Sequence, residues 1–367
     1  MGPYIPEHLP LKNLDYARLF GIVGRANAAL ARYDGLLQGI VNPQVMLSPL
    51  TTQEAVLSSK IEGTQATLDE VLEHEAGIEV EQEKQKDIQE IVNYRTALTS
   101  ARDYLADRPI SLGLLREMHK ILLDSVRGQD KSPGEFRKEQ NWIGPYGVTF
   151  EQATFVPPSP FQLMNHLEQW ETYLRGNDID NLLQAGVVHA QFELIHPFKD
   201  GNGRIGRLLI PLFLYQKKCI SSPMFYLSAY LEEHREDYYQ ALRKISQQQD
   251  WNTWLAFFLQ AIEQQAIENA SRVRKIHLLY DEMKERIRTI SHSQYTIQAL
   301  DGLFDRPIFQ TSDFVKRTGI PKQTTMPMLR QLKEAGILTA LREASGRRST
   351  IYAFKALLNT AEGKEIV

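Results

Sequence analysis

Apolar residues recur at three- and four-residue steps through most of the chain, the spacing of helices that pack on one face. Three stretches show this spacing clearly: residues 88–105, 163–174 and 251–258. We interpret these stripes as packing faces and not as cofactor-binding surfaces. The pattern therefore predicts a mainly α-helical fold.

One interval breaks the helical pattern. Between Pro133 and Pro160, glycine and proline residues alternate with aromatic and β-branched residues. This composition is typical of a short β-hairpin between helices. Such a hairpin often serves as a binding edge, and a plain connecting loop is the alternative.

The last stretch, from about residue 291, changes character. A short helix over 313–317 and a turn at 318–321 precede a second helix that ends at Gly336. Two strands, at 337–341 and 350–354, are expected around a turn at Ser345-Gly346. This order predicts a small α+β winged-helix domain.

The predicted winged helix has only a small positive charge. From residue 291 onward there are eleven Lys and Arg against seven Asp and Glu, and Arg342, Arg347 and Arg348 fall on the predicted wing. Pro327 lies in the predicted recognition helix, where proline is tolerated only near the first turn, so we expect a shortened helix. DNA contact and a role in protein interaction or dimerisation both remain open.

Bulk composition bounds the class of protein. The chain has 367 residues, 43% of them apolar and 24% charged, with a net charge of -3. This predicts a soluble protein of two or three domains without overall attraction to nucleic acid or anionic lipid. The single cysteine, Cys219, and the absence of a signal-like start or a long apolar run favour a cytoplasmic protein without a membrane span.

Candidate chemistry lies in the run from His196 to Arg207, HPFKDGNGRIGR. Pro197 disfavours helix through His196, so His196 should end a helix. Gly201, Asn202 and Gly203 then precede a new helix, whose exposed N-H groups and dipole attract phosphate.

The charged side chains of this run suit polyphosphate. Arg204 and Arg207 are three residues apart and should present two guanidinium groups on one helix face. Asp200 can offer an oxygen to Mg2+, and His196 can accept the proton of an attacking hydroxyl. The residues therefore predict phosphoryl-type transfer by positioning and charge neutralisation.

Three other readings of this run fit less well. The run lacks the Gly-Lys-Ser/Thr ending of a P-loop. A calcium loop would need oxygen donors where Arg204 and Pro211 stand. His189 and His196 have no third metal ligand at a suitable spacing, so we expect His189 to be a buried, hydrogen-bonded histidine.

The run resembles the signature of the Fic family, His-x-Phe-x-(Asp/Glu)-Gly-Asn-Gly-(Lys/Arg)-x-x-Arg, at every fixed position. The resemblance reaches from about Ile110 to Ile262. Residues 133–137 and 155–158 look like the borders of the family's flap, a hairpin at about 138–156 that pairs with a target peptide backbone. It implies a Fic-type helical bundle with a β-hairpin flap, and transfer of AMP from ATP to a Ser, Thr or Tyr hydroxyl.

The resemblance also implies roles for individual residues. His196 would be the base, Phe198 would pack the loop, and Asp200 would hold Mg2+ against the phosphates. Tyr238 and Tyr239 could flank adenine, with a core role as the alternative. The other nucleotide-binding residues would be Gly201, Asn202, Gly203, Arg204, Gly206 and Arg207.

A second motif lies near the N-terminus. Thr51 to Glu54 reads as a capping box that opens a helix over about 51–63, on which Ser58 and Glu62 share a face. Ser58-Ser59-Lys60-Ile61-Glu62-Gly63 resembles the family's inhibitory helix, which implies that Glu62 pairs with Arg207 and displaces the γ-phosphate. A solvated helix charge is the alternative for Glu62.

Taken together, we predict an N-terminal helical region (1–109), a catalytic core (110–270), a linker helix (271–290) and a winged-helix domain (291–367). The expected function is autoinhibited protein adenylylation, with reverse de-AMPylation if Glu62 orients a water. A winged-helix DNA-binding regulator and a Fic enzyme that transfers another phosphate-linked group, such as phosphocholine or UMP, are the alternatives. A homodimer is an expectation from the family only.

Overall fold

The computed structural model describes residues 2–126, 129–144, 149–345 and 348–363. The chain forms two compact units, each assembled from separate stretches. The first combines Met1–Asp34, Leu57–Gly63 and Asn93–Ile267, and the second combines Gly35–Val56, Thr64–Val92 and Glu268–Val367. Four helices contribute residues to both units: α1 (Tyr16–Gln38), α3 (Ser48–Ile61), α5 (Gln82–Tyr104) and α12 (Trp251–Ser291).

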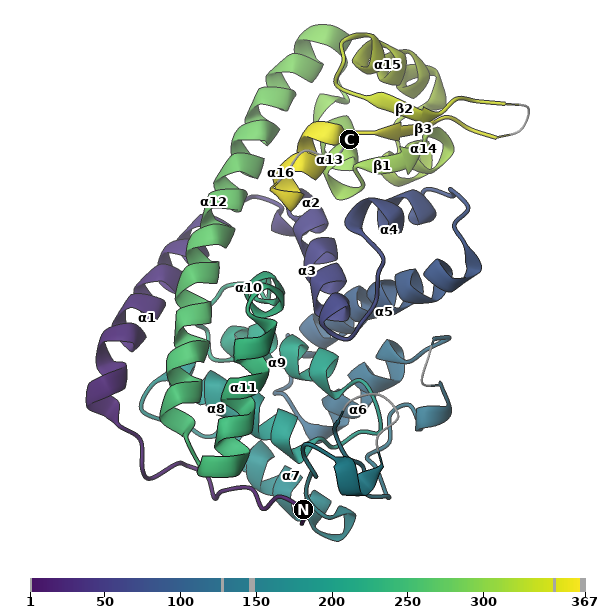
Figure 1. Cartoon of the computed structure of the whole chain (residues 1–367). Helices are drawn as coiled ribbons and strands as arrows, with labels where there is room; N and C mark the ends of the chain where they lie inside the picture. The colour runs from purple at the N-terminus through teal and green to yellow at the C-terminus, as the bar shows by residue number, and fades with distance from the viewer. Residues whose placement is uncertain (1, 127–128, 145–148, 346–347, 364–367) are drawn as a thin grey trace. The chain divides into compact units, whose positions relative to one another are not determined.

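The first unit is helical, as the apolar spacing predicted, and the mainly α fold is confirmed (Figure 1). Within the described residues, no helix combines the length and apolarity that crossing a membrane requires. The domain boundaries drawn from the sequence stay a prediction. The further elements of this unit are α6 (Leu112–Leu122), η1 (Gln129–Lys131), η2 (Phe150–Gln152), α7 (Pro160–Arg175), α8 (Asn181–Ile195), α9 (Asn202–Gln216), α10 (Ser228–Glu233) and α11 (Arg235–Gln248).

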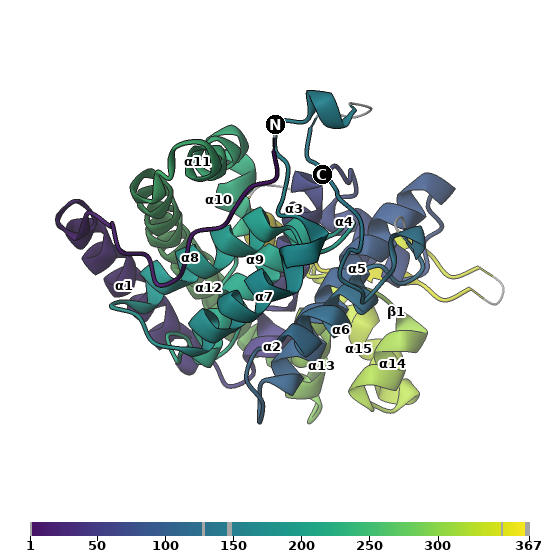
Figure 2. The same cartoon turned by 90° about the horizontal axis from the view of Figure 1, so that it is seen from below.

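Helix α8 lies at the centre of the first unit, beside α7 and α9 (Figure 2). Thirteen of its fifteen residues are buried, because the helix is apolar on all sides. Two indole N-H groups donate to its backbone: Trp170 to the Val188 carbonyl and Trp254 to the Gly186 carbonyl, both at 2.9 Å. These contacts anchor α8, which ends at His196.

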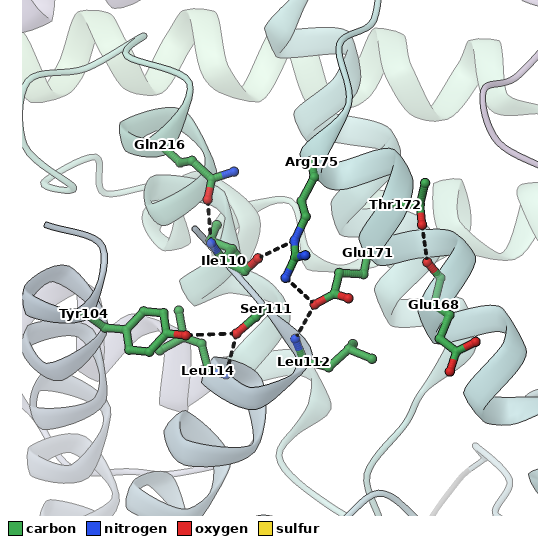
Figure 3. A network of polar contacts seen from close by, with 10 residues as sticks. All are labelled: Tyr104, Ile110, Ser111, Leu112, Leu114, Glu168, Glu171, Thr172, Arg175 and Gln216. Carbon is green, nitrogen blue, oxygen red and sulfur yellow. Dashed lines mark hydrogen bonds and ion pairs between the residues drawn. The ribbon is translucent and has the colours of Figure 1, made fainter. Parts of the chain in front are cut away.

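A polar network fixes the start of α6 (Figure 3). The Ser111 hydroxyl caps the helix by accepting from the Leu114 N-H at 3.1 Å. The Glu171 carboxylate of α7 accepts from the Leu112 N-H at 2.8 Å and from Arg175 at 2.9 Å. The network therefore joins the start of α6 to α7.

Two local predictions in this part of the chain differ from the structure. Helix α3 begins at Ser48 and not at a capping box at Thr51, because the Thr51 and Thr52 hydroxyls donate back to the carbonyls of Leu47 and Ser48 at 3.4 and 3.2 Å. In the predicted hairpin, the described residues form one antiparallel bridge, between Ile143 and Phe155. Residues 145–148 of the expected flap lie outside the described residues.

The second unit contains a small antiparallel sheet with the strand order β1-β3-β2. Ile308 pairs with Ala353 and Thr339 also pairs with Ala353, so β3 is the central strand. The elements of this unit are α2 (Pro43–Met46), α4 (Leu68–Glu75), α13 (Thr296–Asp305), β1 (Ile308–Gln310), α14 (Thr311–Thr318), α15 (Lys322–Glu334), β2 (Thr339–Arg342), β3 (Ile351–Ala353) and α16 (Lys355–Glu362).

The sequence missed β1 and misjudged Pro327. Proline lies inside α15, and the helix continues through it, so the expected shortening is wrong. Met328, Leu329 and Leu332 of the same helix are buried, and their packing outweighs the hydrogen bond that proline removes. The two strands of the predicted wing are present, whereas Gly346 and Arg347 lie outside the described residues.

Candidate active site

The site begins where α8 ends. His196 terminates α8 in the left-handed region, with φ 49° and ψ 61°, and Pro197 follows it. Gly201, at φ 77°, then caps α9. A Cβ at Gly201 would also lie 3.2 Å from Cδ2 of Leu122, so the position favours glycine both by conformation and by packing.

The loop between the two helices is closed by its own side chains. The Asn202 amide oxygen accepts from the Phe198 N-H at 2.8 Å, and its amide nitrogen donates to the Phe198 carbonyl at 2.9 Å. The Phe198 ring is fully buried and stacks on the His119 ring, with centroids 3.9 Å apart. Phe198 thus lies inside the loop, and Asn202 braces the loop from within.

His119 of α6 is a part of the site that sequence reasoning missed. Its Nδ1 accepts from the Gly134 N-H at 2.9 Å, so Nε2 carries the proton and donates to the Asp200 carbonyl at 3.0 Å. Burial lowers the pKa of His119 to about 4, which keeps the ring neutral at pH 7. The side chain supports the turn as a fixed hydrogen-bonding strut.

The imidazole of His196 is held with a free lone pair on Nε2. Its Nδ1 lies 3.3 Å from the Glu193 carbonyl and can only donate to it, which leaves the lone pair on Nε2. Burial, reinforced by the nearby charge of Arg137, lowers the pKa of His196 to about 4, although Glu62 and Asp200 act in the opposite direction. The imidazole is therefore neutral at pH 7 and can accept a proton.

Asp200 and Arg204 flank the start of α9. The Asp200 carboxylate accepts from the Gly201 N-H at 2.7 Å and keeps 43% of its side chain exposed. Arg204 is buried, with Nη2 3.8 Å from Asp200 Oδ1. The described residues include no group of three or more His, Cys, Asp or Glu side chains arranged to bind a metal ion. Asp200 alone suits Mg2+ only if phosphate oxygens and water complete the shell.

Arg207 joins α9 to α3. Its Nε donates to the Ser58 hydroxyl at 2.9 Å and its Nη2 to the Ser58 carbonyl at 2.8 Å. Nη2 also lies 2.7 Å from Oε1 of Glu62, and only 2% of the Arg207 side chain is exposed. Burial opposes ionisation of Glu62, but the charge and hydrogen bond of Arg207, with a contribution from Arg204, hold the Glu62 pKa below its usual value.

The same carboxylate covers the first turn of α9. A Cβ on Gly203 would collide with Oε1 of Glu62 and would lie 3.0 Å from Nη1 of Arg207. Gly203 therefore permits Glu62 to approach the helix N-terminus closely. The structure brings Ser58 and Glu62, four residues apart, together with Arg207, which lies 145 residues beyond Glu62.

The other residues predicted from the sequence are Gly206, His189, Tyr238 and Tyr239. Gly206 faces α8, where a Cβ would collide with Glu193, and its carbonyl lies 2.9 Å from Nδ1 of His189. Nε2 of His189 lies 3.0 Å from the hydroxyl of Tyr238, so the prediction of a buried, hydrogen-bonded His189 is confirmed. The rings of Tyr238 and Tyr239 are 5.2 Å apart.

A cavity of about 570 Å3 is lined by His196, Gly203 and Arg207. Glu193 also lines it, and its Oε1 is buried without a hydrogen-bond partner among the described residues. Burial raises the pKa of Glu193 to about 8. The cavity holds a base, a helix N-terminus and a guanidinium, which are the groups needed to bind phosphate and remove a proton. Its other lining residues include Glu62, Trp142, Ile143, Phe155, His196, Gly203, Arg207, Tyr238, Tyr239 and Leu242.

Comparison with known proteins agrees with this geometry. Residues 21–103 match the family model "Fic/DOC family N-terminal", and residues 109–214 match the model "Fic/DOC family", so that the two together span more than half of the chain. The chain belongs to the Fic/DOC family. The second match contains the whole run from His196 to Arg207, and the first contains Ser58 and Glu62.

Fic relatives with assigned names cover only part of the chain. A probable protein adenylyltransferase of Aquifex aeolicus (strain VF5) is 28% identical over 204 residues, which cover 54% of this chain and 56% of that protein. The protein adenylyltransferase Fic of Aedes aegypti is 31% identical over 140 residues, 36% of this chain and 24% of that protein. The chain thus spans about half of the first relative and a quarter of the second.

The Fic fold extends over nearly the whole chain. A Fic family protein from Desulfovibrio desulfuricans G20 superposes with a TM-score of 0.61 at 21% identity, covering 96% of this chain and 98% of that one. A Fic domain containing signaling protein from Bacteroides thetaiotaomicron VPI-5482 gives a TM-score of 0.55 at 18% identity over 69% of this chain and 96% of that one. These likenesses concern the fold alone.

Proposed function

We propose that this Fic protein transfers AMP from ATP to a hydroxyl group of a target protein and of itself, and that Glu62 inhibits the reaction. The observation that carries the proposal is the 2.7 Å ion pair between Glu62 and Arg207, formed over the N-terminus of α9 in the cavity that also contains His196. The names of the relatives support adenylyl transfer as the reaction class.

The proposed reaction divides among the residues of the cavity. His196 accepts the proton of a Ser, Thr or Tyr hydroxyl through Nε2 while the hydroxyl oxygen attacks the α-phosphorus. The bond from the α-phosphorus to the bridging oxygen breaks, and pyrophosphate leaves. The N-H groups of Asn202 and Gly203 at the start of α9, with Arg204 and Arg207, would bind the phosphates, whereas the Gly201 N-H donates to Asp200.

Asp200 is the residue that would meet Mg2+ entering with ATP, where the ion neutralises phosphate charge. The carboxylate lies at the lip of the turn and is 43% exposed, so it can reach an ion that phosphates hold. Tyr239 lines the cavity and would offer ring surface to a nucleobase, whereas Tyr238 is only 1% exposed and bonds to His189, which fits its alternative role in the core.

Glu62 acts as a brake by occupying Arg207. Its carboxylate takes a guanidinium donor that the nucleotide needs and places negative charge where the γ-phosphate would lie. Release of Glu62 would let ATP adopt the productive geometry. De-AMPylation would use Glu62 to orient a water, with the carboxylate still paired to Arg207. It would appear as loss of label from modified protein.

The helices and strands from α13 to α16 support a winged-helix module in the second unit. Helices α13, α14 and α15 and the three-stranded antiparallel sheet follow the order of that fold, and α16 comes after it. We propose that this module recruits a partner; DNA contact and dimerisation stay predictions. Transfer of a different phosphate-linked group remains the alternative chemistry.

Labelling at two positions of ATP tests the reaction. Glu62→Gly is incubated with Mg2+ and ATP labelled on the α-phosphate or on the γ-phosphate. AMP transfer labels protein only from the α-position, whereas phosphoryl transfer labels it only from the γ-position. His196→Ala in the same background should abolish the label. Label from the γ-position, or none from either, would reject the proposal.

A further inference from the structure

Arg137 is a buried cation at the C-terminal end of α8. It is 3% exposed, and among the described residues the hydrogen-bond acceptors of its guanidinium are all backbone carbonyls. Burial lowers the pKa of Arg137 to about 10, so it stays charged at pH 7. A cation here satisfies the carbonyls that a helix leaves unpaired at its end and complements the helix dipole.

These bonds surround His196. The Arg137 Nε donates to the His196 carbonyl at 2.9 Å, and Nη2 lies 3.4 Å from the Ile195 carbonyl. The Arg137 backbone N-H donates to the Pro197 carbonyl at 2.9 Å. Three consecutive carbonyls are thus held from one residue.

The backbone of His196 needs such support. Its φ of 49° lies in the left-handed region, which residues with a Cβ adopt only when their surroundings hold them there. The carbonyl that Arg137 Nε binds belongs to this same residue. Without that bond the peptide after His196 could rotate, and the direction of the imidazole would change with it.

Arg137 also reaches both ends of the predicted flap. Nη1 donates to the Glu139 carbonyl at 3.3 Å, and Nη2 donates to the Pro158 carbonyl. Gln140 adds a bond across the same ends, to the Pro157 carbonyl at 2.9 Å. One side chain therefore links the base to the segment that the family resemblance assigns to target binding.

We propose that Arg137 is the positioning residue for His196: its fork of N-H groups holds the base in its left-handed backbone conformation and fixes the ends of the flap relative to it. This inference rests on the proposed function, since it assigns the geometry of that reaction's base. The sequence pattern places Arg137 only at a border of the flap.

The test separates the geometry of the fork from its charge. In the Glu62→Gly background, Arg137→Lys keeps a cation but loses the planar fork, and Arg137→Met also removes the charge. Arg175→Lys is the matched control, because Arg175 also donates to a carbonyl, that of Ile110, in a network without cavity residues (Figure 3). Self-labelling rates at saturating ATP, the KM for ATP and melting temperatures are measured for each.

Arg137→Lys should lower the maximal labelling rate on the order of 10- to 100-fold while the KM for ATP changes less than about twofold, because misplacing a base affects the chemical step. Arg175→Lys should retain the rate. Arg137→Met should move the acid limb of the pH profile to higher pH, because a cation beside His196 is gone while Asp200 remains and Glu62 is already absent in this background.

Three results decide the inference. If both Arg137 variants label at the Glu62→Gly rate with its pH profile, the inference is overturned. If Arg137→Met does not fold, the rate of Arg137→Lys decides. If Glu62→Gly itself does not label, the proposed function fails, and NMR titration of His196 in Arg137→Lys and Arg137→Met then tests positioning alone: unchanged His196 resonances in both variants would overturn it.

Discussion

Glu62 and Arg207 are 145 residues apart in the sequence, yet Oε1 of the carboxylate lies 2.7 Å from Nη2 of the guanidinium. The pair is formed where only 2% of the Arg207 side chain meets solvent. A charge-assisted bond of this kind is short and strong. Breaking it leaves the buried cation of Arg207 free to bind another anion. The ion pair and the phosphate site are therefore alternatives for the same guanidinium.

Ser58→Ala should partly release the brake. Its hydroxyl accepts from Nε of Arg207 at 2.9 Å, whereas the Ser58 carbonyl and Glu62 still hold Nη2. We expect a rate of self-labelling between the rates of the wild type and of Glu62→Gly, since a hydrogen bond to a charged group contributes about 1.5–3 kcal/mol to stability. Glu81→Gly, at an exposed loop carboxylate, is the control. Labelling by Ser58→Ala equal to the wild type would show that the hydroxyl does not contribute.

Gly206→Ala should destabilise the protein. The new Cβ would collide with Glu193 and lie 3.3 Å from the His189 ring, and overpacking of this kind costs about 1–3 kcal/mol. Gly24→Ala is the opposite control, because that helical glycine has nothing within 4 Å and alanine there should stabilise by about 0.5–1 kcal/mol. Chemical denaturation measures both. Glu193→Ala should restore part of the loss in the double variant, and no restoration would exclude Glu193 as the cause.

His196 should remain neutral in mildly acidic solution. Its pKa is lowered to about 4, mainly by burial, so the base form persists well below the ordinary value of 6.5. In the nucleotide-free protein, NMR should show the His196 ring titrating below about pH 5.5. Because the pKa is lowered, His196 stays neutral as the pH falls through 6.5. It becomes protonated only near its pKa in the folded protein. A midpoint near 6.5 would contradict the buried environment.

Glu193 should make stability fall as the pH rises. Its pKa is raised by burial from 4.5 to about 8, so between these values the folded state binds more protons than the unfolded state. The free energy of unfolding should then decrease by at most about 1.4 kcal/mol per pH unit in that window. Glu193→Gln removes this slope, whereas Glu168→Gln, at an exposed carboxylate of α7, keeps it. Parallel pH curves for wild type and Glu193→Gln would be inconsistent with a buried neutral carboxyl.

The sequence predicted the site best where the site is local. The turn from His196 to Gly203 depends on proline, glycine and asparagine at fixed spacing, and these residues impose the conformation themselves. The link between Glu62 and Arg207 came from a family resemblance, since no local rule joins residues so far apart. His119 and Arg137 could not be assigned, because their partners are backbone N-H and carbonyl groups whose positions only the tertiary fold determines.

The start of α3 and the length of α15 were also predicted wrongly, because local rules do not include the contacts that the fold makes. The start of α3 was placed at Thr51 because a hydroxyl three residues before a glutamate resembles a cap, yet in the fold these hydroxyls bond to preceding carbonyls. Pro327 was expected to shorten α15, but buried neighbours carry the helix past it. Hydrogen bonds within the helix override the local preference in α3, and buried packing overrides it in α15.

Intact-mass measurement after incubation with ATP and Mg2+ tests the brake and the base together, using wild type, Glu62→Gly and Glu62→Gly/His196→Ala. We expect the mass of one or more adenylate groups on Glu62→Gly, little on the wild type, and none on the double variant. Equal adenylation of all three proteins, or an unmodified Glu62→Gly protein, would contradict a reaction in which His196 is the base and Glu62 the inhibitor.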